Sequence, residues 1–308
     1  MQLRVDQTWT DAKLRGLFLD FRQLGLSRLV VQWTVVGNNA FYPSRAFESL
    51  RNPPLERILA LGDEFAVRVR VGLAYDPEFW THVGIETAPR DLDVYLQRLR
   101  RRSITAAREL APLVRQHRSF DGWFLTEEVD DVNWLLPERR VLIRSYLADL
   151  RDALRSVEPA ANVAVSGFSN AYCDPSTLEA FWRELLTASH VDVLLFQDGI
   201  GTHKLELRYA GLYLAAIKRA AAGSGRALSI VAELFDQVEG PPVTDRPFKA
   251  VPAQIERIER QIALAGEAST DGVFAFSVPD YMLRDAGPDA GRLFGDYVKR
   301  FRASGGSP

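Results

Sequence analysis

The chain has 308 residues, of which 47% are hydrophobic and 25% are charged, and this balance is ordinary for a folded globular protein. Lys and Arg number 38 against 40 Asp and Glu, so the formal net charge of −2 gives no indication of a nucleic-acid partner. This composition excludes disordered and collagen-like classes, and a single cysteine, Cys173, excludes an internal disulfide.

Eight short apolar runs rich in β-branched residues predict strands that are buried on both faces, because apolar residues continue in them without alternation. In chain order these runs are Leu3–Asp6, Leu29–Trp33, Ala66–Val71, Gly122–Thr126, Asn162–Ser166, Val191–Phe196, Leu228–Ala232 and Val273–Phe276.

Longer segments between the runs carry apolar residues at helical spacing, which predicts helices with one apolar stripe facing a sheet. These segments are Thr10–Leu24, Pro54–Leu61, Asp91–Gln116, Pro137–Ser156, a helix opened by Asp174-Pro175-Ser176, Leu205–Ala222, Pro252–Ala265 and Asp289–Ala303.

The alternation of eight strands with helices favours a single (β/α)8 TIM barrel over an open doubly wound sheet. A doubly wound nucleotide-binding sheet has a glycine-rich first turn, and no G-x-G-x-x-G follows any predicted strand. No Pro/Gly-rich linker or fixed-period repeat divides the chain. We therefore predict one barrel domain over residues 1–303, followed by a frayed tail over 304–308.

Active sites of such barrels lie at the carboxyl ends of the strands. Aromatic, amide and carboxylate residues follow the predicted strands, whereas small or plainly solvated residues precede them. Flat rings stack on sugar C–H faces and amides bind hydroxyl groups, so this mixture is typical of carbohydrate sites. The predicted substrate-binding residues are Gln7, Gln32, Trp33, Tyr75, Asn133, Trp134, Ser166, Tyr172, Gln197, Asp198, Phe235 and Ser277.

Glutamates end the fourth and the seventh predicted strands, which lie across the mouth of a barrel from each other. Glycosidic cleavage requires two such carboxyl groups, one as acid and one as nucleophile or base. Glu233 follows strand seven, and Glu127 and Glu128 both follow strand four. Strand alternation places Glu127 and Glu128 on opposite faces, so we expect only one of them to point into the mouth.

Several motifs resemble those of a known bacterial family. They are Val30-Val31-Gln32-Trp33-Thr34, Asp121-Gly122-Trp123-Phe124-Leu125 with Glu128 and Asn133-Trp134, and Leu195-Phe196-Gln197-Asp198-Gly199. The family consists of glycoside-hydrolase-like TIM barrels and is known as a domain of unknown function, DUF4434. The resemblance spans Trp9 to Ser277. It implies a barrel enzyme that acts on a polysaccharide and that is often exported from the cell.

The resemblance also implies roles for the glutamates. The glutamate of the family's strand-four motif matches Glu128, which is therefore preferred to Glu127 as the acid. The pair also resembles that of the large clan of retaining glycosidases, in which the first glutamate is the acid/base and the second is the nucleophile. The clan's asparagine before the first glutamate is absent here, since Thr126 and Glu127 stand in its place. Retention and inversion both stay open.

Other chemistries have weaker support in the sequence. The four histidines are scattered without metal-ligand spacing, no G-x-S-x-G motif is present, and no lysine ends a strand. We predict no cofactor and no metal, and a polysaccharide or oligosaccharide as the partner, with no nucleic acid. The alternative function is a barrel that binds a glycan without cleaving it, and the sequence does not indicate the oligomeric state.

The aromatic residues beyond the strands predict an open cleft that takes an internal stretch of a polysaccharide, which indicates endo action. No run approaches the roughly 18 apolar residues of a membrane span. The first strand is predicted to begin almost at residue 3, and exported barrels need a leader before it. We therefore expect a mature periplasmic or secreted domain whose leader has been removed, with the cytoplasm as the alternative.

Overall fold

The computed structural model describes residues 2–3 and 9–302 and contains one eight-stranded parallel sheet. Its strands lie across the sheet in chain order, unlike those of a doubly wound sheet, in which the order reverses at a switch point. The strands are β1 (Gln2–Leu3), β2 (Arg28–Val31), β6 (Arg68–Gly72), β8 (Phe120–Val129), β9 (Val163–Gly167), β10 (Val193–Gln197), β11 (Ala227–Glu233) and β14 (Gly272–Phe276).

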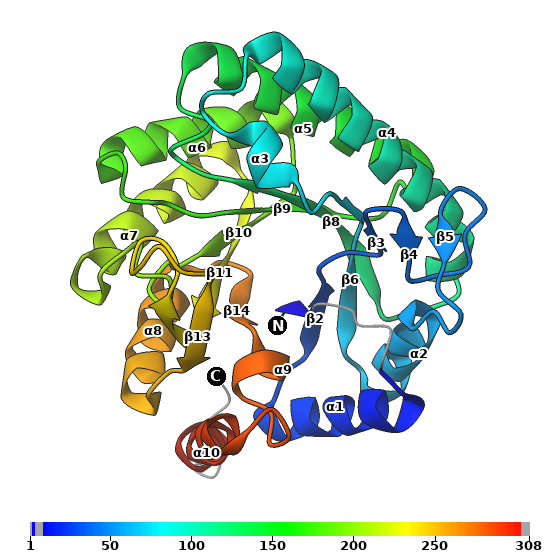
Figure 1. Ribbon diagram of the computed structural model, residues 1–308, viewed down its shortest axis with the longest axis vertical. Coiled ribbons are helices and arrows are strands. Elements are labelled where there is room, and N and C mark those ends of the chain that lie inside the picture. The colour runs from blue at the N-terminus through cyan, green and yellow to red at the C-terminus, as the bar shows by residue number, and fades with distance from the viewer. Residues whose placement is uncertain (1, 4–8, 303–308) are drawn as a thin grey trace.

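The sheet curls, and Figure 1 looks along the axis of the curl. Its two edge strands, β1 and β14, approach each other. Among the described residues, hydrogen-bonded ladders run from β1 to β14, and none joins these two strands. The chain therefore has an α/β fold with a curled parallel sheet that resembles a TIM barrel.

Helices surround the outer face of the sheet (Figure 1). Local sequence signals mark their ends: Thr10 caps the first helix by accepting a hydrogen bond from the Lys13 N–H, and Gly25 ends it at a φ of 74°. The long helices are α1 (Asp11–Leu24), α2 (Leu55–Phe65), α4 (Pro89–Val114), α5 (Pro137–Val157), α6 (Pro175–Ser189), α7 (Leu207–Ser224), α8 (Ile255–Ala268) and α10 (Pro288–Tyr297).

The last helix continues as a short π-helical segment, η1 (Val298–Arg302). The predicted helix over Asp289–Ala303 therefore corresponds to α10 and η1 together, apart from Ala303, which lies outside the described residues. The predicted helix over Pro252–Ala265 begins later, at Ile255, because Lys249–Pro252 forms a strand.

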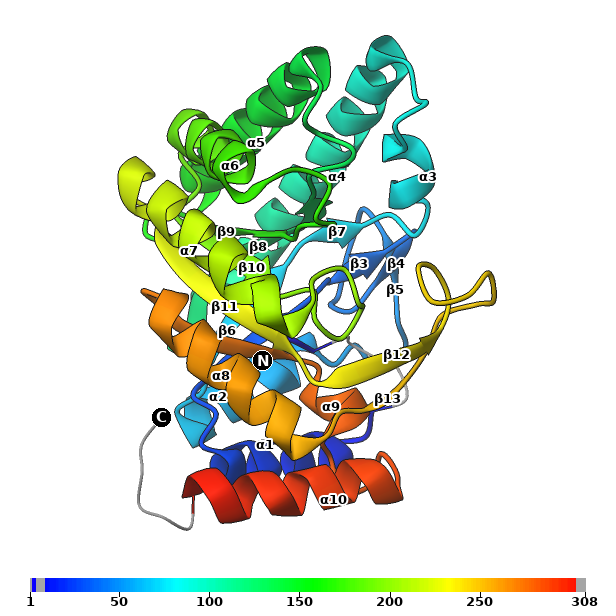
Figure 2. The same ribbon diagram turned by 90° about the vertical axis from the view of Figure 1, so that its left-hand side faces the viewer.

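Small elements that the sequence did not predict extend the segments following the sheet strands. They include a four-stranded sheet beside β2 and β6 and an antiparallel hairpin after β11. Figure 2 shows this hairpin and α3 projecting at the same end of the curled sheet. Their members are β3 (Val35–Val36), β4 (Asn39–Ala40), β5 (Glu48–Ser49), β7 (Ala74–Tyr75), β12 (Phe235–Glu239), β13 (Lys249–Pro252), α3 (Phe79–Val83) and α9 (Val278–Tyr281).

The apolar core has two parts, because side chains alternate across the strands. The larger part lies between the sheet and the helices and includes Trp123 and Trp182. The smaller part fills the inside of the curl with side chains such as Val30, Phe124 and Leu195. Burial on both faces explains why the sheet strands read as continuous apolar runs.

Candidate active site

Glu128 lies at the end of β8 and faces the inside of the curl. In the ladder with β9 it stands opposite Ser166, after an irregularity that takes up Thr126 and Glu127. Its carboxylate accepts a hydrogen bond from the side-chain amide of Gln197 on β10, and the same amide donates to the Ser166 hydroxyl at 3.1 Å. Burial raises the pKa of Glu128, and the negative charges of Glu233 and Asp130 add to this rise.

Glu127 points the other way, toward the helix layer. It is 2% exposed and accepts a hydrogen bond from the Thr126 hydroxyl at 3.4 Å. Its carboxyl group lies near the Tyr146 hydroxyl of α5, and burial raises its pKa to about 7. The structure therefore does not bring Glu127 to the group that contains Glu128, and the chain departs here from the expectation that kept Glu127 as a candidate acid.

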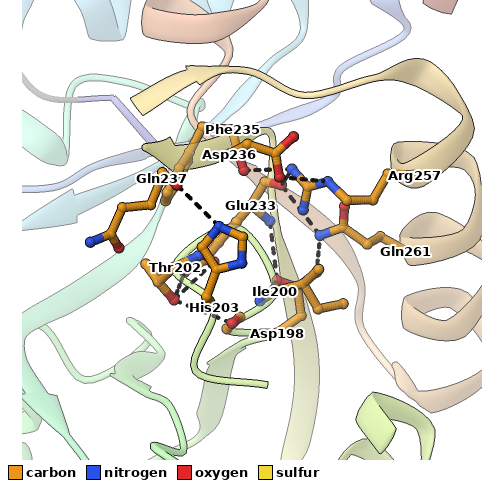
Figure 3. Close-up of polar contacts among 11 residues, drawn as sticks. Asp198, Ile200, Thr202, His203, Glu233, Phe235, Asp236, Gln237, Arg257 and Gln261 are labelled. Atoms are coloured by element: carbon orange, nitrogen blue, oxygen red, sulfur yellow. Dashed lines mark hydrogen bonds and ion pairs between the residues drawn. The ribbon is translucent and has the colours of Figure 1, made fainter. Parts of the chain in front are cut away.

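Glu233 ends β11 and is also 2% exposed (Figure 3). One of its oxygens accepts hydrogen bonds from the Thr202 backbone N–H at 2.8 Å and from the Thr202 hydroxyl at 3.2 Å. A Cβ atom at Gly201 would lie 2.3 Å from the Phe235 carbonyl oxygen, so the close cover over Glu233 requires glycine there. Burial raises the pKa of Glu233, whereas Thr202, Lys204 and Arg257 act to lower it.

Asp198 contacts the backbone of Glu233 and the side chain of Gln261 on α8. Figure 3 shows its carboxylate accepting a hydrogen bond from the Gln261 amide, at 2.6 Å. The other oxygen accepts from the backbone N–H groups of Ile200 and Glu233, at 3.2 and 3.3 Å. Burial and the charge of Glu233 raise the pKa of Asp198 to about 7. Asp198 thus fixes the backbone that carries Glu233. Both of its oxygens accept hydrogen bonds within the protein, and its contact with a substrate stays a prediction.

Lys204 enters the same site from the segment after β10. Its ammonium lies 3.5 Å from the centroid of the Phe168 ring, and the side chain is half-buried. Burial lowers the pKa of Lys204, while Glu128 and Glu233 are the two largest influences that raise it. Lys204 was not among the predicted residues because lysines were considered only where they end a strand, and Lys204 follows β10 by several residues.

An aromatic pair lies beside Glu128. The rings of Trp33 and Tyr75 are stacked with their centroids 4.9 Å apart and are both half-buried. Burial raises the pKa of Tyr75, and the charge of Glu128 adds to this rise. Gln32, which precedes Trp33, is half-buried as well.

Three of the predicted substrate-binding residues are buried in the protein interior. Trp134 is fully buried, and the Arg139 guanidinium lies 5.6 Å from the centroid of its ring. Phe235 is buried and packs on Tyr281, and Ser277 is buried and donates to Asp280. Aromatic loop residues can fill a core as readily as they line a binding groove. Burial of Trp134, Phe235 and Ser277 leaves their contact with a sugar as a prediction.

The remaining predicted residues have mixed positions. Ser166 is buried but contacts Gln197, whereas Tyr172 is 68% exposed. Asn133 is half-buried and donates to Asp130 through both its backbone and its side chain, at 2.7 Å each. Gln7 lies outside the described residues.

No group of three or more His, Cys, Asp or Glu residues in the described part of the chain could hold a metal ion. His203 contacts the Gln237 carbonyl oxygen at 3.0 Å and so ties the segment after β10 to the β12–β13 hairpin (Figure 3). Burial and the nearby Asp131 raise the pKa of the Cys173 thiol to about 12, which suppresses its reactivity. Among the described helices, none has the length and apolar character needed to cross a membrane.

A cavity of about 640 Å³ lies away from these glutamates, on the helix side of the sheet. Apolar side chains such as Leu26, Ile262 and Val273 line it, at the seam between α1, α8 and β14. This cavity is not the predicted sugar cleft, because it lacks the paired carboxyl groups and the stacked rings.

The curled parallel sheet with its surrounding helices is similar to the TIM-barrel folds of glycoside hydrolases. A Bacteroides thetaiotaomicron VPI-5482 protein assigned as an alpha-L-fucosidase superposes with a TM-score of 0.78 at 16% identity, covering 96% of this chain and 88% of that one. An endo-1,4-beta-mannanase from Rhizomucor miehei superposes with a TM-score of 0.56 at 10% identity, covering 97% and 92%. At these identities the likeness establishes the fold.

The chain belongs to the family described as Domain of unknown function (DUF4434), whose family model matches residues 2–290. The uncharacterized protein YbcH of Escherichia coli strain K12 is 30% identical to it over 250 residues, which are 79% of this chain and 77% of that relative. The resemblance inferred from the sequence motifs is thereby confirmed.

Proposed function

We propose that this protein is a glycoside hydrolase that cuts within a polysaccharide, with Glu128 as the acid and Glu233 as the nucleophile or base. The observation that carries the proposal is the pair itself: a half-buried carboxyl group, Glu128, ends β8 and a buried one, Glu233, ends β11, the charge of Glu233 raises the pKa of Glu128, and Lys204 acts on both. The glycosidase-like fold supports it. Bacterial exopolysaccharide is the substrate class that the family resemblance favours.

The two carboxyl groups have different polar neighbours. Burial raises the pKa of Glu128, the Gln197 hydrogen bond and the charge of Lys204 act to lower it, and the charges of Glu233 and Asp130 raise it further. Glu233 receives hydrogen bonds from Thr202 and the field of Arg257, and both favour its ionised form. Burial raises the pKa of both carboxyl groups, and glycosidic cleavage requires that one of them holds its proton while the other is ionised.

The same geometry imposes a requirement on access. Thr202 covers Glu233, so a sugar reaches this carboxylate only when the segment over Gly199–Lys204 moves away from it. The contact of Thr202 with Glu233 favours a second candidate function, a barrel that binds a glycan near Trp33 and Tyr75 without cleaving it. Glycan binding alone does not require that the substrate reaches Glu233.

Hydrolysis of a panel of bacterial exopolysaccharides, followed by assay of new reducing ends, tests the proposal. Glu128→Gln and Glu233→Gln keep the side-chain shapes but remove acid and nucleophile, and each is expected to lower the rate by at least about 100-fold. Glu86→Gln, at an exposed position on the segment before α4, is the matched control. Normal hydrolysis by Glu233→Gln would contradict the assignment, and binding without new reducing ends would establish the second candidate.

The anomeric form of the first product, followed by NMR, decides the stereochemistry. Retaining enzymes have carboxyl groups about 5–5.5 Å apart and inverting enzymes about 6.5–9.5 Å apart. Product size decides between endo and exo action, since internal cleavage gives a range of oligosaccharides at early times. The stereochemistry and the mode of cleavage are measured on the wild type, and the Gln variants identify which residues catalyse the reaction.

We further propose that residues 1–303 form one catalytic domain in which the sheet closes into a complete (β/α)8 barrel, and that the protein works in the periplasm or outside the cell. An exopolysaccharide substrate supports that location. Fractionation of cells that express the full gene checks it, and recovery in the cytoplasm alone would contradict it.

A further inference from the structure

A second cavity, lined mainly by polar and charged residues, lies at the end of the curled sheet where the strands begin, opposite to Glu128 and Glu233. Its volume is about 290 Å³, and residues at the starts of β2, β6, β8, β10 and β11 line it. Four arginines are among these residues: Arg28, Arg68, Arg70 and Arg226. Neither the proposed hydrolysis nor the core packing accounts for so many guanidinium groups in one cavity.

Arg70 is the most deeply buried of the four. In the β2–β6 ladder it stands opposite Val30, which belongs to the core inside the curl, whereas its neighbours Val69 and Val71 belong to the helix-side core. Arg70 is therefore directed inward, and it is 3% exposed. Arginine stays charged in proteins, so a full positive charge lies at the base of the sheet.

The partners of Arg70 are insufficient for a buried guanidinium. Its Nη2 lies 3.5 Å from Asp121, and that carboxylate also pairs with Arg68 at 3.0 Å. The Nε and Nη1 atoms of Arg70 are buried and have no hydrogen-bond partner among the described residues. Buried donors without acceptors cost free energy, and native proteins satisfy nearly all of them with protein, water or a ligand.

The carboxylates around the cavity are already engaged by other groups. Asp271 pairs with Arg28 at 2.7 Å. Asp192 accepts from Arg155 of α5 at 3.0 Å and from the Val163 N–H at 2.8 Å. These two carboxylates and Asp121 are the acidic groups that line the cavity.

Arg226 has no carboxylate partner among the described residues. It donates to Nδ1 of His190 at 3.0 Å, so that imidazole nitrogen acts as an acceptor, and the Arg226 Nε is buried without a partner. Arg226 is half-buried just before β11 and borders the cavity. Because Arg226 has no carboxylate partner among the described residues and Arg70 shares one with Arg68, positive charge is in excess around this half-open polar cavity.

We propose that this cavity binds a small tetrahedral oxyanion, phosphate or sulfate, between Arg70 and Arg226. The planar guanidinium fork matches the oxygens of such an anion, and charge-assisted hydrogen bonds to it are stronger than those between neutral groups. The bound anion supplies acceptors for the unpartnered donors and links the starts of β6 and β11 across the sheet. The site is independent of the proposed hydrolysis.

Calorimetric titration of the purified protein with inorganic phosphate, and separately with sulfate, tests the proposal at constant ionic strength. We expect one saturable site and a saturable rise in Tm, because a ligand that binds only the folded state stabilises it. Arg226→Gln is expected to weaken the affinity at least about tenfold through the loss of a charged donor. Arg292→Gln, at an exposed position on α10, is the matched control and should bind both anions as the wild type does.

Arg70→Met is a second variant and should also bind the anion more weakly. If Arg70→Met does not fold, Arg226→Gln still tests the proposal. Exclusion of sulfate from protein surfaces raises Tm without saturation and equally in all variants, so the two effects are distinguishable. Absence of saturation with both anions in the wild type would overturn the proposal. Equal affinities of Arg226→Gln and Arg292→Gln would also overturn it.

Discussion

Replacing Glu127 by Gln should remove one contribution to the pH dependence of the free energy of unfolding. Glu127 is 2% exposed between Thr126 and Tyr146, and burial raises its pKa from the ordinary value of 4.5 to about 7. A shift of this size corresponds to about 3 kcal/mol, since one pKa unit is worth about 1.4 kcal/mol. The folded protein therefore carries an acid that resists ionisation.

The sign of the effect follows from proton binding. Between pH 4.5 and 7 the unfolded chain has lost this proton while the folded protein still holds it. Stability contributed by Glu127 is thus complete below pH 4.5, falls as pH rises, and is lost above pH 7. Gln has nearly the same shape and does not titrate, so the stability difference between variant and wild type should move by about 3 kcal/mol in favour of Gln from about pH 4 to about pH 8.

Urea denaturation at several pH values, followed by both tryptophan fluorescence and circular dichroism, measures this difference. Constant packing effects of the amide cancel, because the prediction concerns only the change with pH. Glu86→Gln on the exposed surface should show no such change. A difference between Glu127→Gln and wild type that is independent of pH would refute the reasoning, and so would a decline of the variant relative to wild type as pH rises.

Three further predictions concern the candidate site. Lys204→Met removes a charge that lowers the pKa of both glutamates, so the bell-shaped profile of kcat/KM should move to higher pH, and Lys204→Arg should restore it. Trp33→Ala removes a ring stacked on Tyr75 and should weaken glycan binding roughly tenfold, measured as KM or as an affinity. Trp134→Ala should lower the free energy of unfolding by about 3–5 kcal/mol because the ring is fully buried, whereas Tyr172→Ala on the surface should change it by less than about 0.5 kcal/mol in the same urea titration.

The strands of the sheet were largely predictable because burial on both faces leaves a simple pattern. Val193–Gln197 and Ala227–Glu233, for example, lie within a few residues of the runs that the sequence predicts. The hairpin β12–β13 was not predictable in this way. Its residues are mostly half-buried or exposed and give no continuous apolar run, and Pro252 reads as a helix start although it ends a strand.

The candidate site was predictable where position along a strand decides orientation. Glu128 and Glu233 lie at the carboxyl ends of strands in one parallel sheet, so their arrival at one end follows from the fold. Burial of the rings was not predictable. Trp33 and Trp134 both follow strands, but one stacks half-buried on Tyr75 and the other packs beneath the loops against Arg139. Only the path of each loop decides between these outcomes.

Loop path also explains how Lys204 joins the glutamates. The segment after β10 turns at Gly199, whose φ is 66°, and the Gly199 carbonyl oxygen accepts hydrogen bonds from the backbone of Lys204 and Leu205, at 3.0 Å each. This tight turn returns the chain over the end of β11, so that Thr202 binds Glu233 while Lys204 lies on Phe168. One short segment therefore covers Glu233, the proposed nucleophile or base, and supplies a positive charge that acts on Glu128, the proposed acid. Because both contacts depend on the same turn, movement of Thr202 away from Glu233 should also displace Lys204, which couples substrate access to the ionisation of the two glutamates.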